Sequence, residues 1–83
     1  MFMSGKEEEM EDKILAILRE INPYEEINVE SKLIKDAILD SLTLVILIAE
    51  IEATFQIKIP EDKLQPELFE DVPRIIGLIN ELL

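Results

Sequence analysis

The longest apolar stretch of the chain, which runs from Leu42 to Ile51 (LTLVILIAEI), constrains the fold more than any other feature. Glu50 and Glu52 interrupt it, and it is shorter than the roughly 20 apolar residues that a membrane-spanning helix needs. We therefore expect a helix of a globular protein, without membrane insertion, from Ser41 to Phe55. Residues at intervals of three and four form its core-facing side, namely Leu44, Leu47, Ile48, Ile51 and Phe55.

The opposite side of this helix is also apolar, although a side that faces solvent is normally polar. A helical projection places four residues there, namely Leu42, Val45, Ile46 and Ala49. Either a short third helix or the first loop covers these residues, or they form a docking patch for partner proteins, because exposed apolar patches commonly mark interaction sites.

Two further helices flank the central one. The first is expected from Lys6 to Ile21 and ends at Asn22-Pro23, because proline cannot donate the next helical hydrogen bond. The last begins after Asp71, a good N-cap, and tolerates Pro73 in its first turn. Their predicted core residues are Met10, Ile14, Ile17, Leu18 and Ile21 in the first helix, and Val72, Ile75, Ile76, Ile79, Leu82 and Leu83 in the last.

The connections between the helices lack sustained periodicity. A long first loop reaches Asp40 and holds four apolar residues that should pack across the helices, namely Ile27, Val29, Leu33 and Ile34. Ile57 to Ile59 alternates like a strand but has no second strand to pair with, so we expect an extended linker with its isoleucines turned inward. Pro60 and Pro66 are placed to open short helical turns. The predicted fold is all-α: a small bundle of three main helices plus one short helix, with residues 1–5 as a flexible tail and 6–83 as one domain.

Composition excludes several functions. A net charge of −11 repels nucleic acid and anionic lipid but attracts basic protein surfaces. The chain has neither cysteine nor histidine, so it offers no disulfide, no thiolate and no imidazole base. The acids Glu7, Glu8, Glu9 and Glu11, and the pair Glu50 and Glu52, are interpreted as solvated helix faces rather than as metal or acid/base sites. We therefore expect no catalytic residue and no metal site, and a cytoplasmic protein, because the N-terminus lacks the pattern of a secretory signal.

One serine stands out in the segment ILDSL, residues 38–42. Ser41 lies where the central helix should begin, at the end of the long loop, and a helix N-terminus favours a negatively charged group attached there. The structural alternative is a helix N-cap formed by a serine or aspartate at this point.

Two segments around this serine resemble the acyl carrier protein family. The stretch LDSLTLVILIAEIEATFQIKIP, residues 39–60, is similar to the family's segment in Asp-Ser-Leu and in the later Glu52, Phe55, Ile59 and Pro60. The ending LFEDVPRIIGLINELL, residues 68–83, resembles the family's final helix. The resemblance implies an acyl-carrier-like bundle that bears 4'-phosphopantetheine, donated by coenzyme A and attached to Ser41. It also implies a phosphopantetheinyl transferase that works with magnesium, and Asp40 assisting at that interface; a plain N-cap is the competing role for Asp40.

The resemblance further implies that the arm supplies the missing thiol and swings acyl or aminoacyl thioesters between partner enzymes. These partners would be activating ligases and synthases of fatty-acid, polyketide, peptide or D-alanine transfer pathways. The central helix is more apolar than in most fatty-acid carriers. The segment Ile-Leu-Asp-Ser, preceded by Ala37, is more similar to the corresponding segment of peptidyl and D-alanyl carriers. We expect a stand-alone monomer. An unmodified helical adaptor with the same fold and a carboxylate enzyme are the alternatives.

Overall fold

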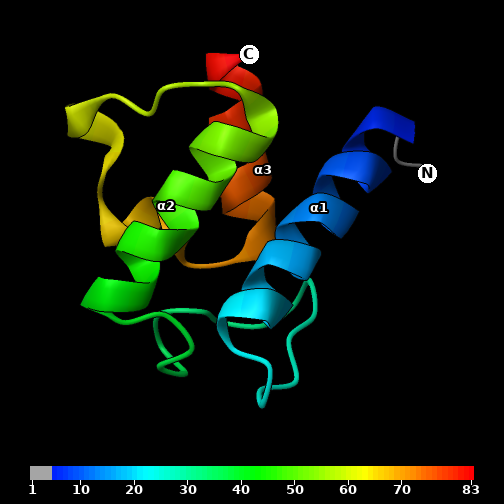
Figure 1. The fold of residues 1–83 in the computed structure, drawn as a ribbon, viewed down its shortest axis with the longest axis vertical. Helices are drawn as coiled ribbons and strands as arrows, with labels where there is room; N and C mark the ends of the chain where they lie inside the picture. The colour runs from blue at the N-terminus through cyan, green and yellow to red at the C-terminus, as the bar shows by residue number, and fades with distance from the viewer. Residues whose placement is uncertain (1–4) are drawn as a thin grey trace.

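The computed structural model describes residues 5–83, with side chains described from Glu8 onward. It is an all-helical bundle, in which α1 (Gly5–Ile21) and α2 (Ser41–Phe55) run in opposite directions and α3 (Val72–Leu82) packs behind them (Figure 1). Two 3₁₀ turns, η1 (Glu61–Lys63) and η2 (Pro66–Phe69), connect α2 to α3. No strand occurs among residues 5–83, so the all-α prediction is confirmed.

The helix ends lie close to where the sequence places them. The Asn22 N–H still bonds the Leu18 carbonyl at 2.9 Å, and Pro23 then stops α1. Gln56 ends α2 in the left-handed conformation, with its N–H bonded to the Glu52 carbonyl. At the other end of α1, Gly5 is already helical, one residue before the expected start, and the rest of the predicted tail lies outside the described residues.

The core lies where the three helices meet. Most of the predicted core residues are buried or half-buried, including Ile14, Leu47 and Ile75, none of which has exposed surface. The sequence-based set missed five buried residues: Leu15, Ile38, Leu39, Phe69 and Leu78. The prediction for Leu83 was wrong, because this residue follows the last turn of α3 as its C-cap and is 57% exposed.

Hydrogen bonds order the long first loop. The Leu33 N–H donates to the Glu70 carbonyl beside η2, and the Leu39 N–H donates to the Leu33 carbonyl, both at 2.8 Å. The Asn22 side-chain amide donates to the Ile38 carbonyl at 2.8 Å and so joins the end of α1 to the segment before α2. As predicted, this loop packs across the helices: Ile27 and Leu33 are buried, and Val29 and Ile34 are half-buried against the core.

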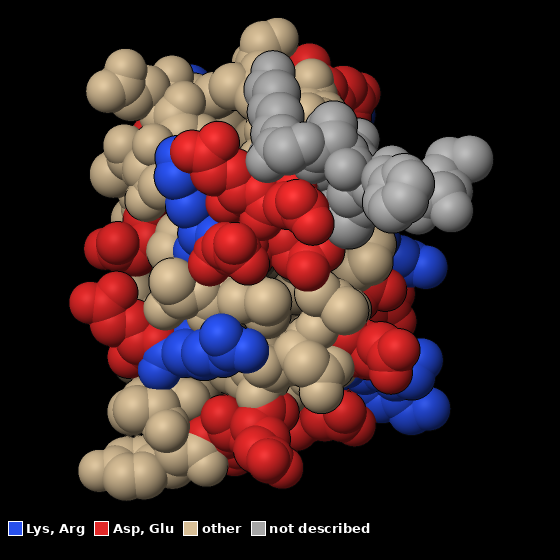
Figure 2. Space-filling model, turned by 90° about the vertical axis from the view of Figure 1, so that its right-hand side faces the viewer, with Lys and Arg blue, Asp and Glu red and all other residues tan. Residues whose placement is uncertain are grey.

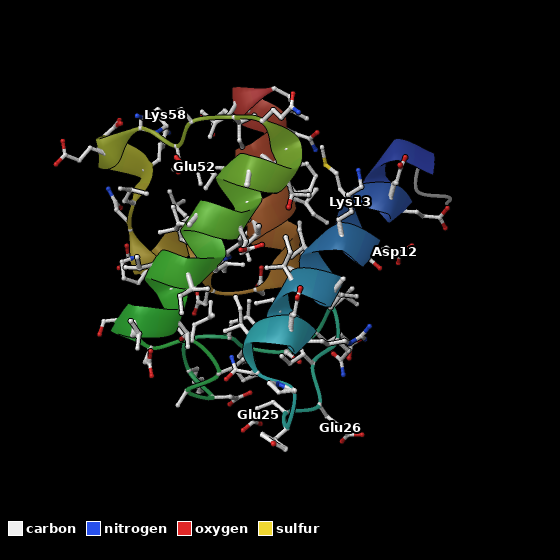
Figure 3. All side chains as sticks on the ribbon, viewed as in Figure 1. Asp12, Lys13, Glu25, Glu26, Glu52 and Lys58 are labelled. Carbon is white, nitrogen blue, oxygen red and sulfur yellow. The ribbon has the colours of Figure 1, made fainter. Side chains whose placement is uncertain are left out.

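The second connection is anchored by one carboxylate of α2. Glu52 lies near the end of α2, next to the linker that carries Lys58 (Figure 3), and its Oε2 accepts the Ile59 N–H at 2.9 Å. Ile57 to Ile59 is extended, as predicted, with Ile59 buried and Ile57 half-buried. As predicted, short helical turns begin at Pro66 and directly after Pro60. They are two separate 3₁₀ turns, where the predicted bundle counted one short helix.

Acidic side chains form distinct groups on the outer surface (Figure 2). Figure 2 shows acidic side chains gathered in several groups on one face of the molecule, with fewer basic side chains among them. Within residues 5–83, no helix combines the length and the apolar character that crossing a membrane would require.

Candidate functional site

Ser41 is the first residue of α2, at the end of the bundle where the first loop lies (Figure 1). Its side chain is exposed, and the preceding residue, Asp40, has the extended backbone of an N-cap (φ −113°, ψ −172°). The structure therefore presents the Ser41 hydroxyl to solvent at the N-terminus of a 15-residue helix.

Asp40, not Ser41, caps the helix. Its Oδ1 accepts the N–H groups of Leu42 and Thr43 at 3.0 and 2.9 Å and the Thr43 hydroxyl at 3.0 Å. In return, the Thr43 hydroxyl oxygen accepts the Asp40 N–H at 2.8 Å, which completes a capping box. The backbone N–H of Thr43, and then its hydroxyl, hold the pKa of the Asp40 carboxyl below its ordinary value of 3.8.

This network has two consequences for the predicted site. The alternative that Ser41 itself is the cap is wrong, because Asp40 takes that role and the Ser41 hydroxyl is outside the capping bonds. All three bonds accepted by the Asp40 side chain converge on Oδ1, so the cap does not use Oδ2. Asp40 can therefore cap α2 and still direct one carboxylate oxygen elsewhere.

Another described serine, Ser31, has a different setting. It lies half-buried in the first loop, and its Oγ accepts the Asn28 N–H at 3.0 Å. The Asn28 side chain in turn accepts the Glu30 N–H at 2.8 Å, so Ser31 belongs to a hydrogen-bonded turn.

The four residues of the predicted docking patch share an exposed face of α2. Leu42, Val45 and Ile46 are 69%, 63% and 41% exposed, and Ala49 is also exposed. The expectation that a short helix or the first loop covers them is therefore wrong, because the 3₁₀ turns and the loop pack elsewhere. We call these four residues the apolar stripe.

Sequence reasoning missed Tyr24, an aromatic residue in the first loop that is almost fully exposed. The first loop has no periodic pattern from which the orientation of this side chain could be predicted.

A groove between α1 and α2 was also missed. It has a volume of about 360 Å³, and we call it the seam groove. Six residues line it, namely Ile17, Glu20 and Ile21 of α1 and Thr43, Ile46 and Glu50 of α2. Only the packing of two helices creates it, so neither helix alone signals it in the sequence.

Of the predicted acidic groups, the side chain of Glu7 lies outside the described ones, Glu8 and Glu50 are exposed and Glu11 is half-buried. Glu9 pairs with Lys13 at 3.9 Å, and Glu52 holds the linker through Ile59. In the part of the chain that the structure describes, no group of three or more acidic side chains is arranged to hold a metal ion.

Comparison with known protein families gives a match over most of the chain. A family model described as a phosphopantetheine attachment site matches residues 12–80, which is well over half of the chain and includes Asp40 and Ser41. No curated protein and no solved structure gives a significant match.

Proposed function

Because the chain belongs to the phosphopantetheine attachment-site family, whose members carry 4'-phosphopantetheine covalently on a serine, we propose that Ser41 bears this arm. The chain is thus a phosphopantetheine carrier protein, of a family whose domains are non-catalytic carriers. The observation that supports Ser41 is its exposure at the start of α2. The matched region contains one other serine, Ser31, which is engaged in a loop turn.

The first turn of α2 suits an attached phosphate in one respect only. The helix N-terminus favours a negative charge there. Asp40, however, already accepts the N–H groups of Leu42 and Thr43, so these two donors are not available to cradle the phosphate. The Ser41 oxygen would therefore hold the arm by its covalent bond, and the arm would be free to turn toward a partner.

Loading would make one bond and break another. The Ser41 oxygen bonds to the phosphorus that bears pantetheine in coenzyme A, and that phosphorus loses its bond to the oxygen leading to the adenosine part. The hydroxyl proton passes to a base of the transferase, and the nucleotide leaves as the second product. The 4'-phosphopantetheine supplies the thiol that forms thioesters, which this chain lacks because it has no cysteine.

Asp40 assists loading in this proposal. Its Oδ2 is outside the capping network, and its lowered pKa keeps the carboxylate ionised. A magnesium ion of the transferase complex prefers carboxylate and phosphate oxygens, so Asp40 can contribute one ligand beside the incoming phosphate. Capping uses Oδ1 and metal binding would use Oδ2, so the two roles that the sequence offered for Asp40 are compatible.

The apolar stripe is the proposed docking surface for the transferase and for the enzymes that use the loaded arm. Leu42 and Val45 lie within the first two turns of α2, next to Ser41, and their exposed side chains can enter a partner's apolar pocket. The net charge of −11 would steer basic partners toward the protein. We propose acyl- or aminoacyl-activating ligases and synthases as these partners, in fatty-acid, polyketide, peptide or D-alanine transfer.

The test is the intact mass of the protein before and after incubation with coenzyme A, magnesium and a broad-specificity phosphopantetheinyl transferase. We expect a gain of one phosphopantetheine group in the wild type and in Ser31→Ala, and none in Ser41→Ala. A folded, initially unmodified wild type that gains nothing would contradict the proposal and favour an unmodified adaptor. A gain that survives in Ser41→Ala but disappears in Ser31→Ala would move the site to the loop.

A further inference from the structure

The seam groove combines an apolar floor with acidic edges. Ile17, Ile21 and Ile46 contribute the apolar surface, while Glu20 and Glu50 stand on opposite helices. A second hollow, also about 360 Å³, lies further along the same helices, between Met10 and Lys13 of α1 and Thr54 and Phe55 of α2. Thr43, Ile46, Glu50 and Thr54 repeat at intervals of three and four, so both hollows lie along one side of α2.

The length of this seam matches a short helix. Thr43 and Thr54 are separated by about 16 Å along the helix axis, which corresponds to about three turns. A volume of about 360 Å³ admits several apolar side chains of an inserted helix, and an amphipathic helix lying in an apolar groove is a recurring mode of recognition.

The charges select among possible occupants. Lys13 pairs with Glu9 and lies over the Phe55 ring, 5.8 Å from its centre, so its charge is engaged at the far end of the seam. Glu20 and Glu50 remain as the charged residues that line the seam groove. A second copy of this chain would bring another net charge of −11 to an acidic surface, and nucleic acid would be repelled in the same way. A basic helix is the complementary occupant.

The groove also lies away from the attachment serine. Thr43 and Glu50 follow Ser41 by two and nine positions, which places them about 200° and about 180° around the helix from it. Val45 lies only about 40° from Ser41, so the apolar stripe and the seam groove occupy different sectors of α2 that meet at Ile46. A protein bound in the groove would leave the Ser41 side of the helix accessible.

We propose that the seam groove binds a basic amphipathic helix of a partner protein, as a second docking site that operates while Ser41 is engaged elsewhere. The apolar side of the bound helix packs on Ile17, Ile21 and Ile46, and its flanking Lys or Arg residues face Glu20 and Glu50. This site goes beyond the proposed carrier function and does not require that Ser41 carry an arm.

The test uses the full chain and a synthetic peptide of about three turns, held helical by a lactam bridge, with leucines on one side and lysines along both flanks. A second peptide has glutamate in place of each lysine. We expect the basic peptide alone to bind and to shift the methyl NMR signals of Ile17, Ile21 and Ile46, with those of Ile59 and Ile79 unchanged.

Matched variants locate the binding. The double variant Glu20→Gln/Glu50→Gln should weaken binding about five- to tenfold at low salt, because exposed ion pairs are individually weak. The double variant Glu61→Gln/Asp62→Asn changes the net charge equally on η1 and should leave affinity unchanged. Ile46→Ala should weaken binding, whereas Val45→Ala, which truncates the apolar stripe outside the groove, should not.

Four results would overturn the docking site. These are no binding of the basic peptide, equal binding of the acidic one, equal losses in the groove and control variants, and self-association through these methyl groups in sedimentation experiments. Loading of Ser41 is measured separately with the peptide bound. We expect its rate to change less than about twofold, because the groove shares only Ile46 with the apolar stripe and leaves Leu42, Val45 and Ala49 exposed. Failure of loading with and without peptide would refute the carrier proposal and leave the groove result standing.

Discussion

The first turns of α2 and α3 have the same type of cap, but their first residues differ in exposure to solvent. Each turn follows an aspartate that has an extended backbone and whose side chain accepts an N–H of the first turn. Asp40 accepts the N–H of Thr43, and Asp71 accepts the N–H of Arg74. The next residue differs, because Ser41 is exposed at the start of α2 and Val72 is fully buried at the start of α3. A capping aspartate therefore marks where a helix begins, and burial of the following residue separates a structural start from an accessible one.

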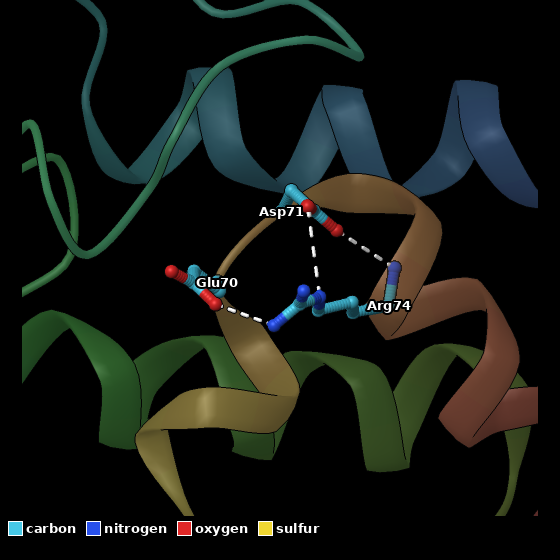
Figure 4. A network of polar contacts seen from close by, with 3 residues as sticks. All are labelled: Glu70, Asp71 and Arg74. Carbon is cyan, nitrogen blue, oxygen red and sulfur yellow. Dashed lines mark hydrogen bonds and ion pairs between the residues drawn. The ribbon is translucent and has the colours of Figure 1, made fainter.

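The neighbours of the two caps strengthen this contrast. Arg74 forms ion pairs with both Asp71 and Glu70 (Figure 4), which lie where the chain passes from η2 into α3. The Asp40 side chain instead bonds only the first turn of its own helix, through Leu42 and Thr43. The start of α3 thus pairs its acidic residues with a cation of its own first turn, while the start of α2 carries a negative charge toward solvent.

The largest effects are expected from polar and apolar substitutions at Val72 and Ser41, the residues that follow the two capping aspartates. Val72→Ser should lower the free energy of unfolding by about 3 kcal/mol, because it leaves a cavity and buries a hydroxyl. Ser41→Val should change it by less than about 0.5 kcal/mol, since the site is exposed, yet abolish loading. Urea unfolding and intact mass measure the two outcomes, and equal destabilisation by both substitutions would contradict the contrast.

A substitution at Asp40 can separate its two roles. Asparagine is a good N-cap, so Asp40→Asn should keep α2 intact while slowing transferase loading about tenfold through loss of a metal-binding carboxylate. Asp40→Ala should slow loading and also destabilise the helix. Helical circular dichroism and loading rates distinguish the cases, and wild-type loading of Asp40→Asn would show that Asp40 acts as a cap alone.

The approaches to the two helices differ at one backbone position. Ala37 precedes α2 in the left-handed conformation, with φ 57°, whereas no such residue occurs among the described residues between Gln56 and α3. Glycine adopts this conformation without the steric cost that alanine bears, so Ala37→Gly should stabilise the fold by about 1 kcal/mol. Ala49→Gly, in the exposed middle of α2, should destabilise by about the same amount. Thermal unfolding of both variants tests the assignment, and destabilisation by Ala37→Gly would oppose it.

The smallest expected effect concerns acid titration. Because the folded pKa of Asp40 lies below 3.8, its contribution to stability is present above that pH and is lost as pH falls through the folded value. Thr43→Val removes the hydroxyl donor and should bring the pKa of Asp40 closer to 3.8. NMR titration of the Asp40 carboxyl carbon measures both values, and an unchanged pKa in Thr43→Val would contradict the capping account.

Local sequence signals predicted the helices and the exposed serine because their causes are local. Pro23 ends α1, Asp71 begins α3, and Asp40 and Ser41 stand at the start of the apolar run. Burial of Ile38 and Leu39 could not be read in the same way, since it depends on bonds to distant residues such as Asn22. The seam groove depends on two helices at once, so it appears only in the assembled fold.

The hydrogen bonds of the first loop also limit the motion of the segment that leads into α2. The amide protons of Leu33 and Leu39 are bonded at buried residues outside any helix, so they should exchange with solvent as slowly as protons of the helical core. Slow exchange at both amides would mean that the loop opens only with the whole domain and keeps the start of α2 in place. Delivery of a cargo would then depend on motion of the attached arm, while the protein beneath it acts as a rigid platform.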